Sequence, residues 1–231
     1  MGTKKYRLTE NHINIGNRIL YQIEALKDFG SVKAGDLGGY IESEKNLSQY
    51  DNAWVYGDAQ VLGNAQVFDN ARVYGNACVF DNARVYGNAC VFGNAQVFDN
   101  ARVYGNACVF DNARVYGNAC VFDNAEVYDN AQVLGNAQVL GNARVFGDAQ
   151  IKSARDYIVF KNWWSSGRYF TWTRSNNMWK VGCFYGTGEE LIKKAYNDSK
   201  ESGREYERIV RYVESILADE KRKENEPIGI K

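Results

Sequence analysis

The sequence has very little proline and very little histidine. Its 231 residues include one proline, Pro227, so nothing before that point interrupts a ladder of backbone hydrogen bonds. The one histidine, His12, lies outside the repetitive middle of the chain, which excludes an imidazole base on the repeats themselves. The five cysteines contain no Cys-x-x-Cys spacing, and we predict no metal site and no cofactor.

Net charge and long apolar runs are also lacking. The 28 basic and 28 acidic residues cancel, so the chain has no bulk attraction to nucleic acid or to acidic membranes. No apolar run approaches the ~20 residues of a membrane span, and no signal peptide opens the chain. We therefore expect a cytoplasmic protein with no membrane partner and no strong nucleic-acid signal.

The dominant feature is a six-residue unit written sixteen times between Val55 and Gln150. Valine is first, glycine or aspartate third, asparagine or aspartate fourth, and alanine fifth. The Ala-x-Val-x alternation is typical of a strand, and the Gly/Asp-Asn pair favours a corner. Three units then close a triangle. The pattern predicts a parallel β-helix of a little over five coils, with valine and alanine inside and a length of roughly 25 Å.

The repeats resemble the hexapeptide-repeat left-handed parallel β-helix superfamily, in which an aliphatic residue is followed four places later by a small one. The resemblance implies a left-handed coil. One departure concerns the second position, which is often glycine in acyltransferases of that superfamily and is Tyr, Phe or Leu here.

Segments outside the repeats carry a closer resemblance. They are residues 20–30, 35–39, 182–187 and 203–206. Together with the hexads they are similar to a set of uncharacterised phage- and prophage-encoded hexapeptide-repeat proteins. That resemblance implies a viral accessory role and transfers no catalytic residue.

The chain divides by pattern into three predicted parts, and the fold class is mainly β. An N-terminal β cap occupies residues 1–52, the β-helix residues 53–151, and a small C-terminal α+β domain residues 152–231. In the cap we expect short strands at residues 6–8, 13–15 and 19–23. In the C-terminal domain we expect a strand at 157–160, a hairpin over 168–184, a helix opened by a capping box at Thr187, and a helix over 202–223.

The second position of each hexad points outward and carries mostly tyrosine and phenylalanine. Stacking between coils explains part of this pattern, but it leaves the ring edges in water, and so large an apolar patch is unusual on a monomer. We therefore predict a homo-oligomer, a trimer or a dimer. The expected interface residues are Tyr74, Phe92, Phe110 and Tyr128.

Four of the cysteines occupy the outward sixth position of their hexads. Only Cys90 and Cys108 are eighteen residues apart, which places them on adjacent coils of one face. A disulfide between them is geometrically conceivable, although reduced thiols are favoured in a cytosolic protein.

Four of the five tryptophans fall within seventeen residues, interleaved with cations. Two interpretations stay open. The indoles form the core of a small domain, or Trp and Arg form a recognition patch that could stack a nucleobase beside a phosphate. The predicted binding residues are Trp163, Trp164, Arg168, Trp172, Arg174, Trp179 and Lys180.

Two observations argue against catalysis on the repeats. A lone histidine in a cap strand, such as His12, is more often structural than catalytic. Residues 73–90 and 103–120 are identical but offset by thirty, so the same outward residues fall on different faces of the triangle. A cleft enzyme needs fixed groups on a fixed face, and we therefore predict no catalytic residues.

The function that we predict is a non-catalytic oligomeric binding protein of phage origin, with counter-defence inhibition as its purpose. It would present its C-terminal domain to a host protein or a signalling nucleotide. Two alternatives stay open, a hexapeptide-repeat acyltransferase and a structural or polymer-forming phage component.

Overall fold

The computed structural model describes residues 4–225 and divides them between two compact units. Unit 1 comprises Met1–Val159 and Thr173–Asn176, and unit 2 comprises Phe160–Trp172 and Asn177–Lys231. The predicted cap and the predicted β-helix thus belong to one unit, because their side chains share one hydrophobic core. The first boundary between the units follows Val159, eight residues after the expected end of the β-helix at residue 151. Unit 1 also includes a hairpin tip, Thr173–Asn176.

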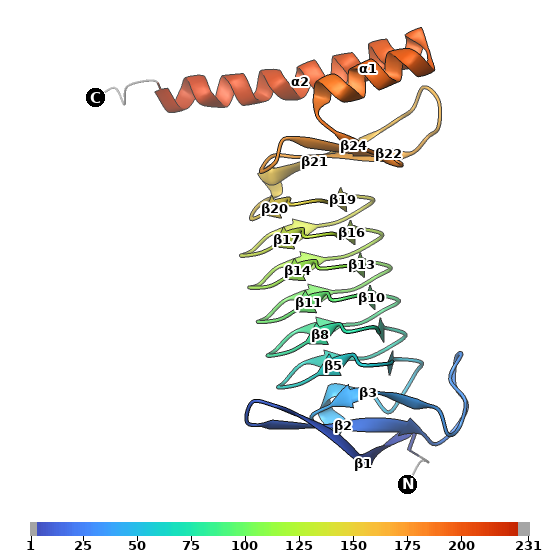
Figure 1. Cartoon of the computed structure of the whole chain (residues 1–231). Helices are drawn as coiled ribbons and strands as arrows, with labels where there is room; N and C mark the ends of the chain where they lie inside the picture. Colours follow the sequence, from blue (N-terminus) through green and yellow to red (C-terminus); the bar gives the residue numbers. More distant parts are fainter. Residues whose placement is uncertain (1–3, 226–231) are drawn as a thin grey trace. The chain divides into compact units, whose positions relative to one another are not determined.

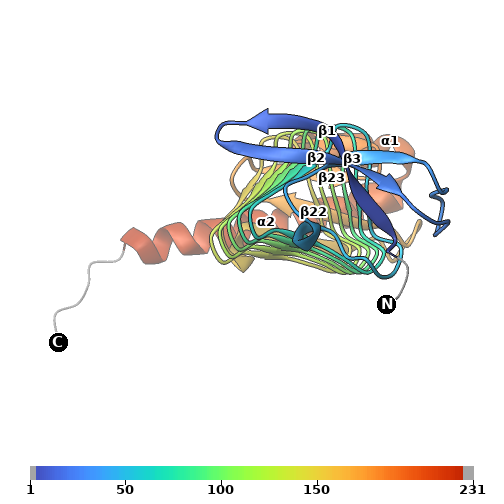
Figure 2. The ribbon, with the colours of Figure 1, turned by 90° about the horizontal axis from the view of Figure 1, so that it is seen from below.

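Unit 1 is a parallel β-solenoid with three walls of short strands (Figures 1 and 2). Wall 1 contains β3 (Leu37–Ile41), β5 (Gln60–Val61), β8 (Cys78–Val79), β11 (Gln96–Val97), β14 (Arg114–Val115), β17 (Gln132–Val133) and β20 (Gln150–Ile151). Wall 2 contains β4 (Trp54–Val55), β7 (Arg72–Val73), β10 (Cys90–Val91), β13 (Cys108–Val109), β16 (Glu126–Val127) and β19 (Arg144–Val145). Wall 3 contains β6 (Gln66–Val67), β9 (Arg84–Val85), β12 (Arg102–Val103), β15 (Cys120–Val121) and β18 (Gln138–Val139).

Each short strand joins the sixth residue of one hexad to the first residue of the next. In-register parallel pairing places residues eighteen apart on adjacent coils, as Val91 and Val109 show. The first-position valines and fifth-position alanines of the repeats are at most 1% exposed. The predicted in-out alternation is therefore confirmed, and burial of these apolar side chains is the main force that closes the coil.

The corners fall on the predicted Gly/Asp-Asn pair. The left-handed backbone conformation is adopted by the third residue of the hexad, as at Asp69 (φ 58°) and Gly75 (φ 72°). The asparagines instead stack into side-chain ladders, in which Asn82 Nδ2 donates to Asn100 Oδ1 at 3.2 Å and Asn100 Nδ2 donates to Asn118 Oδ1 at 3.2 Å. An amide suits this position because it carries both a donor and an acceptor.

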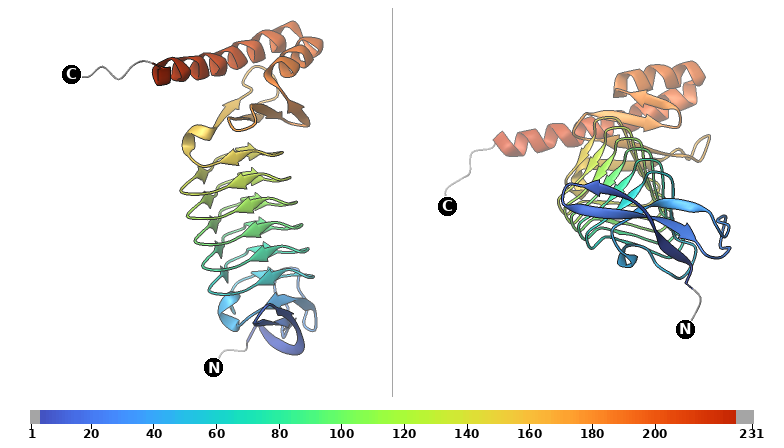
Figure 3. Two further views of the ribbon diagram at one scale, coloured as in Figure 1. Left: turned by 60° about the vertical axis from the view of Figure 1, so that its left-hand side comes forward. Right: turned by 60° about the horizontal axis from the view of Figure 1, so that its bottom comes forward.

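A hairpin caps the N-terminal end of the solenoid (Figure 3). β1 (Tyr6–Ile15) and β2 (Arg18–Ala25) pair antiparallel around Gly16, whose φ is 59°. The two strands expected at 6–8 and 13–15 are therefore one strand. β2 pairs with β3, which enters wall 1 by parallel pairing with β5.

The solenoid extends below the hexads, so that it has about six turns, whereas the hexads alone predicted a little over five. The lowest coil is built from residues without the hexad pattern, including the 3-10 turn η1 (Glu44–Asn46). The buried Asn46 side chain donates to the carbonyls of Gly63 (3.1 Å) and Ala65 (2.9 Å), and so replaces backbone donors of a regular strand. This coil is closed from below by Lys5, whose fully buried Nζ donates to Tyr50 O (3.1 Å) and Ala53 O (2.8 Å).

An antiparallel sheet and two helices follow the solenoid along the chain, and unit 2 comprises most of them, although residues 157–159 and 173 of the sheet are assigned to unit 1. The sheet order is β21 (Tyr157–Lys161), β22 (Tyr169–Thr173), β23 (Met178–Val181) and β24 (Phe184–Gly186), and the 3-10 turn η2 (Ala154–Asp156) precedes it. Gly182 adopts a positive φ of 55° and divides the strand expected over 178–184 into two. The sheet leads into α1 (Gly188–Asp198) and α2 (Lys200–Asn225).

The capping box that was expected at Thr187 is confirmed. Its Oγ1 accepts from Glu190 N at 3.3 Å, and Glu190 Oε2 accepts from Thr187 N at 2.8 Å. These bonds satisfy two donors that the first turn of α1 would otherwise leave unpaired. One side of α2 is apolar and packs inward, with Tyr206, Val210 and Val213 buried.

Candidate functional site

The best-formed candidate site is a loop of unit 2 between β21 and β22, which we call the indole loop (Lys161–Tyr169). Asn162 organises it. The Asn162 backbone N donates to Arg168 O at 2.8 Å and closes the loop, while Asn162 Oδ1 accepts from Ser165 N at 2.9 Å and Ser166 N at 3.3 Å. Its Nδ2 donates to the Tyr206 hydroxyl on α2 at 3.0 Å. A buried asparagine with all these bonds fixes the loop to the body of unit 2.

Two adjacent tryptophans in this loop take opposite roles. The Trp164 ring packs against Tyr206 with centroids 5.0 Å apart and against Phe170 at 6.4 Å. The Trp163 side chain is left 73% exposed, with its ring edge-on to Trp164 at 6.0 Å. The inner indole therefore anchors the loop, and the outer indole stands in solvent on a fixed support.

Cations and a second aromatic ring accompany the exposed indole. Arg168 and Lys161 are exposed, and Lys161 Nζ lies 5.8 Å from the centroid of the Tyr169 ring, which is itself partly exposed. The nine residues of the loop include no acidic side chain. The loop thus combines positive charge with aromatic surface, a composition that suits an acidic or phosphorylated ligand.

The structure divides the seven predicted binding residues. Trp163, Trp164 and Arg168 share the indole loop. Trp172 and Trp179 are 1% and 2% exposed, so the prediction that they form a surface patch is wrong. Trp172 Nε1 donates to Asn177 Oδ1 at 2.9 Å, and Trp179 packs against Phe160 with centroids 5.9 Å apart, because the inner face of this small sheet needs large apolar side chains.

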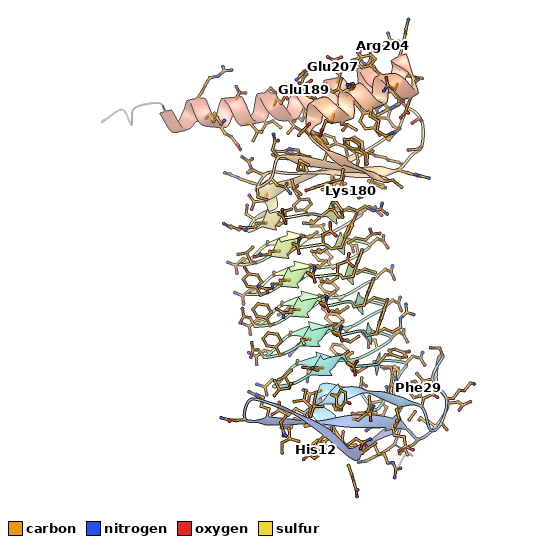
Figure 4. All side chains as sticks on the ribbon, in the orientation of Figure 1. His12, Phe29, Lys180, Glu189, Arg204 and Glu207 are labelled. Atoms are coloured by element: carbon orange, nitrogen blue, oxygen red, sulfur yellow. The ribbon has the colours of Figure 1, made fainter. Side chains whose placement is uncertain are left out.

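The remaining two residues lie outside the indole loop. Arg174 belongs to unit 1, where its backbone N donates to Asp156 O at 2.8 Å and its Nε to Arg155 O at 3.0 Å. These bonds hold the hairpin tip, so the side chain has a structural role. Lys180 is a half-buried residue of β23, which Figure 4 labels on the sheet.

The predicted interface residues form an aromatic ladder on wall 2. Tyr74, Phe92, Phe110 and Tyr128 stack with successive centroid distances of 4.8, 4.7 and 4.6 Å and with planes within 10° of parallel. Each ring is half-buried because the coils above and below cover its two faces. Stacking therefore takes up much of the apolar surface, and the ring edges form a continuous stripe. That this stripe is an oligomer interface stays a prediction.

A polar row runs beside the aromatic ladder at the sixth hexad position. From the N-terminal end it contains Arg72, Cys90, Cys108, Glu126 and Arg144. The Arg144 guanidinium pairs with the Glu126 carboxylate at 3.1 Å. At the other end a shallow depression of about 310 Å³ is lined by Ser31, Tyr56, Arg72 and Tyr74.

His12, the candidate base, lies in β1 of the cap hairpin (Figure 4). Its ring is exposed, its Nδ1 lies 3.0 Å from the carbonyl oxygen of Glu10, and its nearest aromatic neighbour is Tyr21 at 6.2 Å. The imidazole is thus part of the cap and not of a solenoid wall. Over residues 4–225, no helix is both long enough and apolar enough to cross a membrane.

The stacked coils define a parallel β-solenoid protein. In agreement with this class, the family model described as the YdcK beta solenoid repeat matches residues 65–80, 83–97 and 95–109. A curated relative, the uncharacterized acetyltransferase YdcK of Escherichia coli (strain K12), is 39% identical over 61 residues. The match spans 23% of this chain and 19% of the relative. The segments that the family model matches lie within the repeats, which are the scaffold.

Proposed function

We propose that this protein is a non-catalytic binding protein whose solenoid carries the indole loop as its recognition element. The observation that supports this most directly is Trp163, an indole 73% exposed on a loop that buried Asn162 and Trp164 hold in place. Exposing so large an apolar ring to water is unfavourable, whereas tryptophan and arginine together dominate binding hot spots. A fixed loop also loses little conformational entropy on binding.

The partner proposed is a protein of the bacterial host that presents an acidic surface. The complementary charges come from Arg168 and Lys161, which flank the indole in a loop without acidic residues. The phage origin, the cytoplasmic location in the host and the counter-defence purpose are parts of this proposal, and they rest on the resemblance of the sequence to phage-encoded proteins. A signalling nucleotide is the other ligand that the same charges would accept.

Self-association of the solenoid is the second part of the proposal. The stripe of ring edges on wall 2 is long, regular and aromatic, and a second copy of the chain would offer a matching stripe. An oligomer displays several indole loops at once and gains avidity without any new contact.

The test compares proteins captured from a host lysate by the wild type and three variants. Trp163→Ala and Arg168→Ala remove the recognition groups, and Tyr212→Ala, an exposed aromatic of α2 in the same unit, is the matched control. We expect one host protein to be retained by the wild type and by Tyr212→Ala and to be lost with the other two, while all four melt at the same temperature. The purified partner should then bind the wild type in calorimetry. Equal capture by the wild type and all three variants would refute the role of the loop.

The second candidate function is that of an acetyltransferase, which the printed name of the Escherichia coli relative favours. This chain would need His12 or a carboxylate as its base, because the repeats carry no histidine. The decisive measurement is thermal stability with and without acetyl-coenzyme A. A shift in melting temperature that saturates with acetyl-coenzyme A and is weakened by His12→Ala would favour the enzyme, and the binding proposal expects no shift.

A further inference from the structure

Two cysteines of the polar row lie directly above one another on wall 2. Cys90 of β10 and Cys108 of β13 are register partners in parallel strands, and both are free thiols. The local spacing of the coils is given by their neighbours Phe92 and Phe110, whose ring centroids are 4.7 Å apart. A Cα separation of that size falls within the ~4.4–6.8 Å that disulfides span.

A cation lies against one of the two sulfurs. Arg72, one coil below, donates from its Nη2 to Cys90 Sγ at 3.3 Å. The pKa of Cys90 is lowered to about 6, first because the Cys108 thiol hydrogen-bonds to it and also because of the Arg72 charge. The pKa of Cys108 is raised by the same hydrogen bond and by burial. The Arg72 cation thus favours the thiolate form of Cys90, and burial favours the thiol form of Cys108, which is the arrangement of an attacking and a resolving sulfur.

The other two cysteines of the repeats provide a comparison within the same molecule. Cys120 has an arginine one coil below it, Arg102, but its neighbour above is Gln138. Cys78 lies between Gln60 and Gln96 and has no cation in register, and burial raises its pKa. Only at Cys90 do an arginine and a second thiol adjoin the same sulfur.

We propose that Cys90 and Cys108 are an oxidation site, at which a hydroperoxide converts the two thiols into a disulfide that joins adjacent coils. The Cys90 thiolate attacks the peroxide, the O–O bond breaks, and Cys90 becomes a sulfenic acid while an alkoxide, or hydroxide from hydrogen peroxide, leaves and takes up a proton. Cys108 then attacks the Cys90 sulfur, the S–S bond forms, the S–O bond breaks, and water leaves with the Cys108 proton. Two thiols are oxidised and one peroxide is reduced.

The geometry of the solenoid makes this bond reversible. In-register parallel strands keep equivalent atoms ~4.8 Å apart, whereas the two Cβ atoms of a disulfide prefer ~3.8 Å. Closing the bond therefore draws two coils together against their Val and Ala packing. Disulfides that store strain in this way are the ones more readily reduced. Cys90 is 6% exposed, and a hydroperoxide is small enough to reach a sulfur of such limited exposure.

The experiment treats the full chain with hydrogen peroxide, blocks the remaining thiols, and maps the peptides by mass spectrometry. We expect a Cys90–Cys108 linkage to form before Cys78, Cys120 or Cys183 is oxidised, and to disappear with dithiothreitol. With the sulfenic acid trap dimedone, Cys108→Ser should yield an adduct on Cys90, whereas Cys90→Ser should yield little on Cys108. Arg72→Gln should slow the linkage several-fold at neutral pH.

The experiment includes a matched control, and several outcomes would contradict the proposal. Arg102→Gln, which removes the equivalent cation beside Cys120, should leave the rate unchanged, and circular dichroism verifies that each variant is folded. If all the cysteines react at similar rates, or if Arg72→Gln has no effect, the site does not exist as proposed. An adduct on Cys108 in place of Cys90 would overturn the assignment of the attacking sulfur.

Discussion

Lys5 offers the sharpest test of how the N-terminal cap closes the solenoid. The side chain is fully buried, with its Nζ bonded to two carbonyl oxygens and 4.9 Å from the centroid of the Phe29 ring. Burial lowers the pKa of Lys5 from 10.5 to about 8, and the nearby Asp51 carboxylate limits the decrease. The perturbation is Lys5→Met, which keeps the length of the side chain and removes its charge.

The sign of the effect follows from proton linkage. The pKa is lower in the folded state than in the unfolded state, so between these two values the unfolded chain binds more protons, and stability rises with pH. At pH values below the folded pKa, the buried charge lowers the free energy of unfolding by about 3 kcal/mol. This cost is relieved as the pH rises through the folded pKa. From about pH 7 to about pH 9.5 the wild type should gain about 2 kcal/mol relative to Lys5→Met.

Urea unfolding followed by tryptophan fluorescence measures this difference, because Trp54 lies in the same cap core, 5.3 Å from Phe29. Comparison at each pH cancels the titration of groups that both proteins share. Tyr6, whose pKa is raised by burial, stays protonated over the range when folded. The quantity to compare is the free energy of unfolding of the wild type minus that of Lys5→Met. If this quantity stays flat or falls with rising pH, Lys5 is not buried as a charged group.

Three further substitutions test other parts of the structure. Gly39→Ala would place a Cβ 2.6 Å from Ala59 O and 2.8 Å from Val55 Cγ1. We therefore expect this substitution to lower the free energy of unfolding in urea by about 1–3 kcal/mol. Gly16→Ala should lower it less, because its Cβ would meet no atom within 4 Å. Asn100→Ala removes two hydrogen bonds of an exposed asparagine ladder and should cost about 1–2 kcal/mol; an unchanged melting temperature would mean that the ladder is energetically neutral. Phe92→Ala opens the middle of the aromatic ladder and should lower the molecular mass seen by light scattering if wall 2 is the interface, whereas Phe98→Ala on another wall should not.

The hexad pattern carried most of the information on unit 1. Its period fixes which side chains face inward and which residues stack, so the valine core and the alignment of Cys90 with Cys108 could be predicted from spacing alone. The lowest coil could not, because Asn46 and Lys5 replace the hexad hydrogen bonds there with long-range contacts. The corner was predicted at the correct pair of residues, but which member of the pair is left-handed could not be predicted, because glycine, aspartate and asparagine all tolerate that conformation.

The indole loop was predictable only in part. Clustering of tryptophan and arginine drew attention to this segment, but local sequence could not separate Trp163, which is exposed, from Trp172 and Trp179, which are buried. Their burial depends on how the sheet meets α1 and α2, which is a tertiary effect. One local signal was available, since an asparagine in a turn, as at Asn162, often accepts hydrogen bonds from the backbone that follows it.

Calorimetric titration tests the central claim most directly, namely that this solenoid binds through the indole loop and performs no acyl transfer. Wild type and Trp163→Ala would each be titrated with the captured host partner and with acetyl-coenzyme A. We expect the host partner to give saturable heat with the wild type and none with Trp163→Ala. Acetyl-coenzyme A should give no saturable heat with either protein. Saturable binding of acetyl-coenzyme A that survives Trp163→Ala, together with partner binding that is indifferent to this substitution, would contradict the central claim.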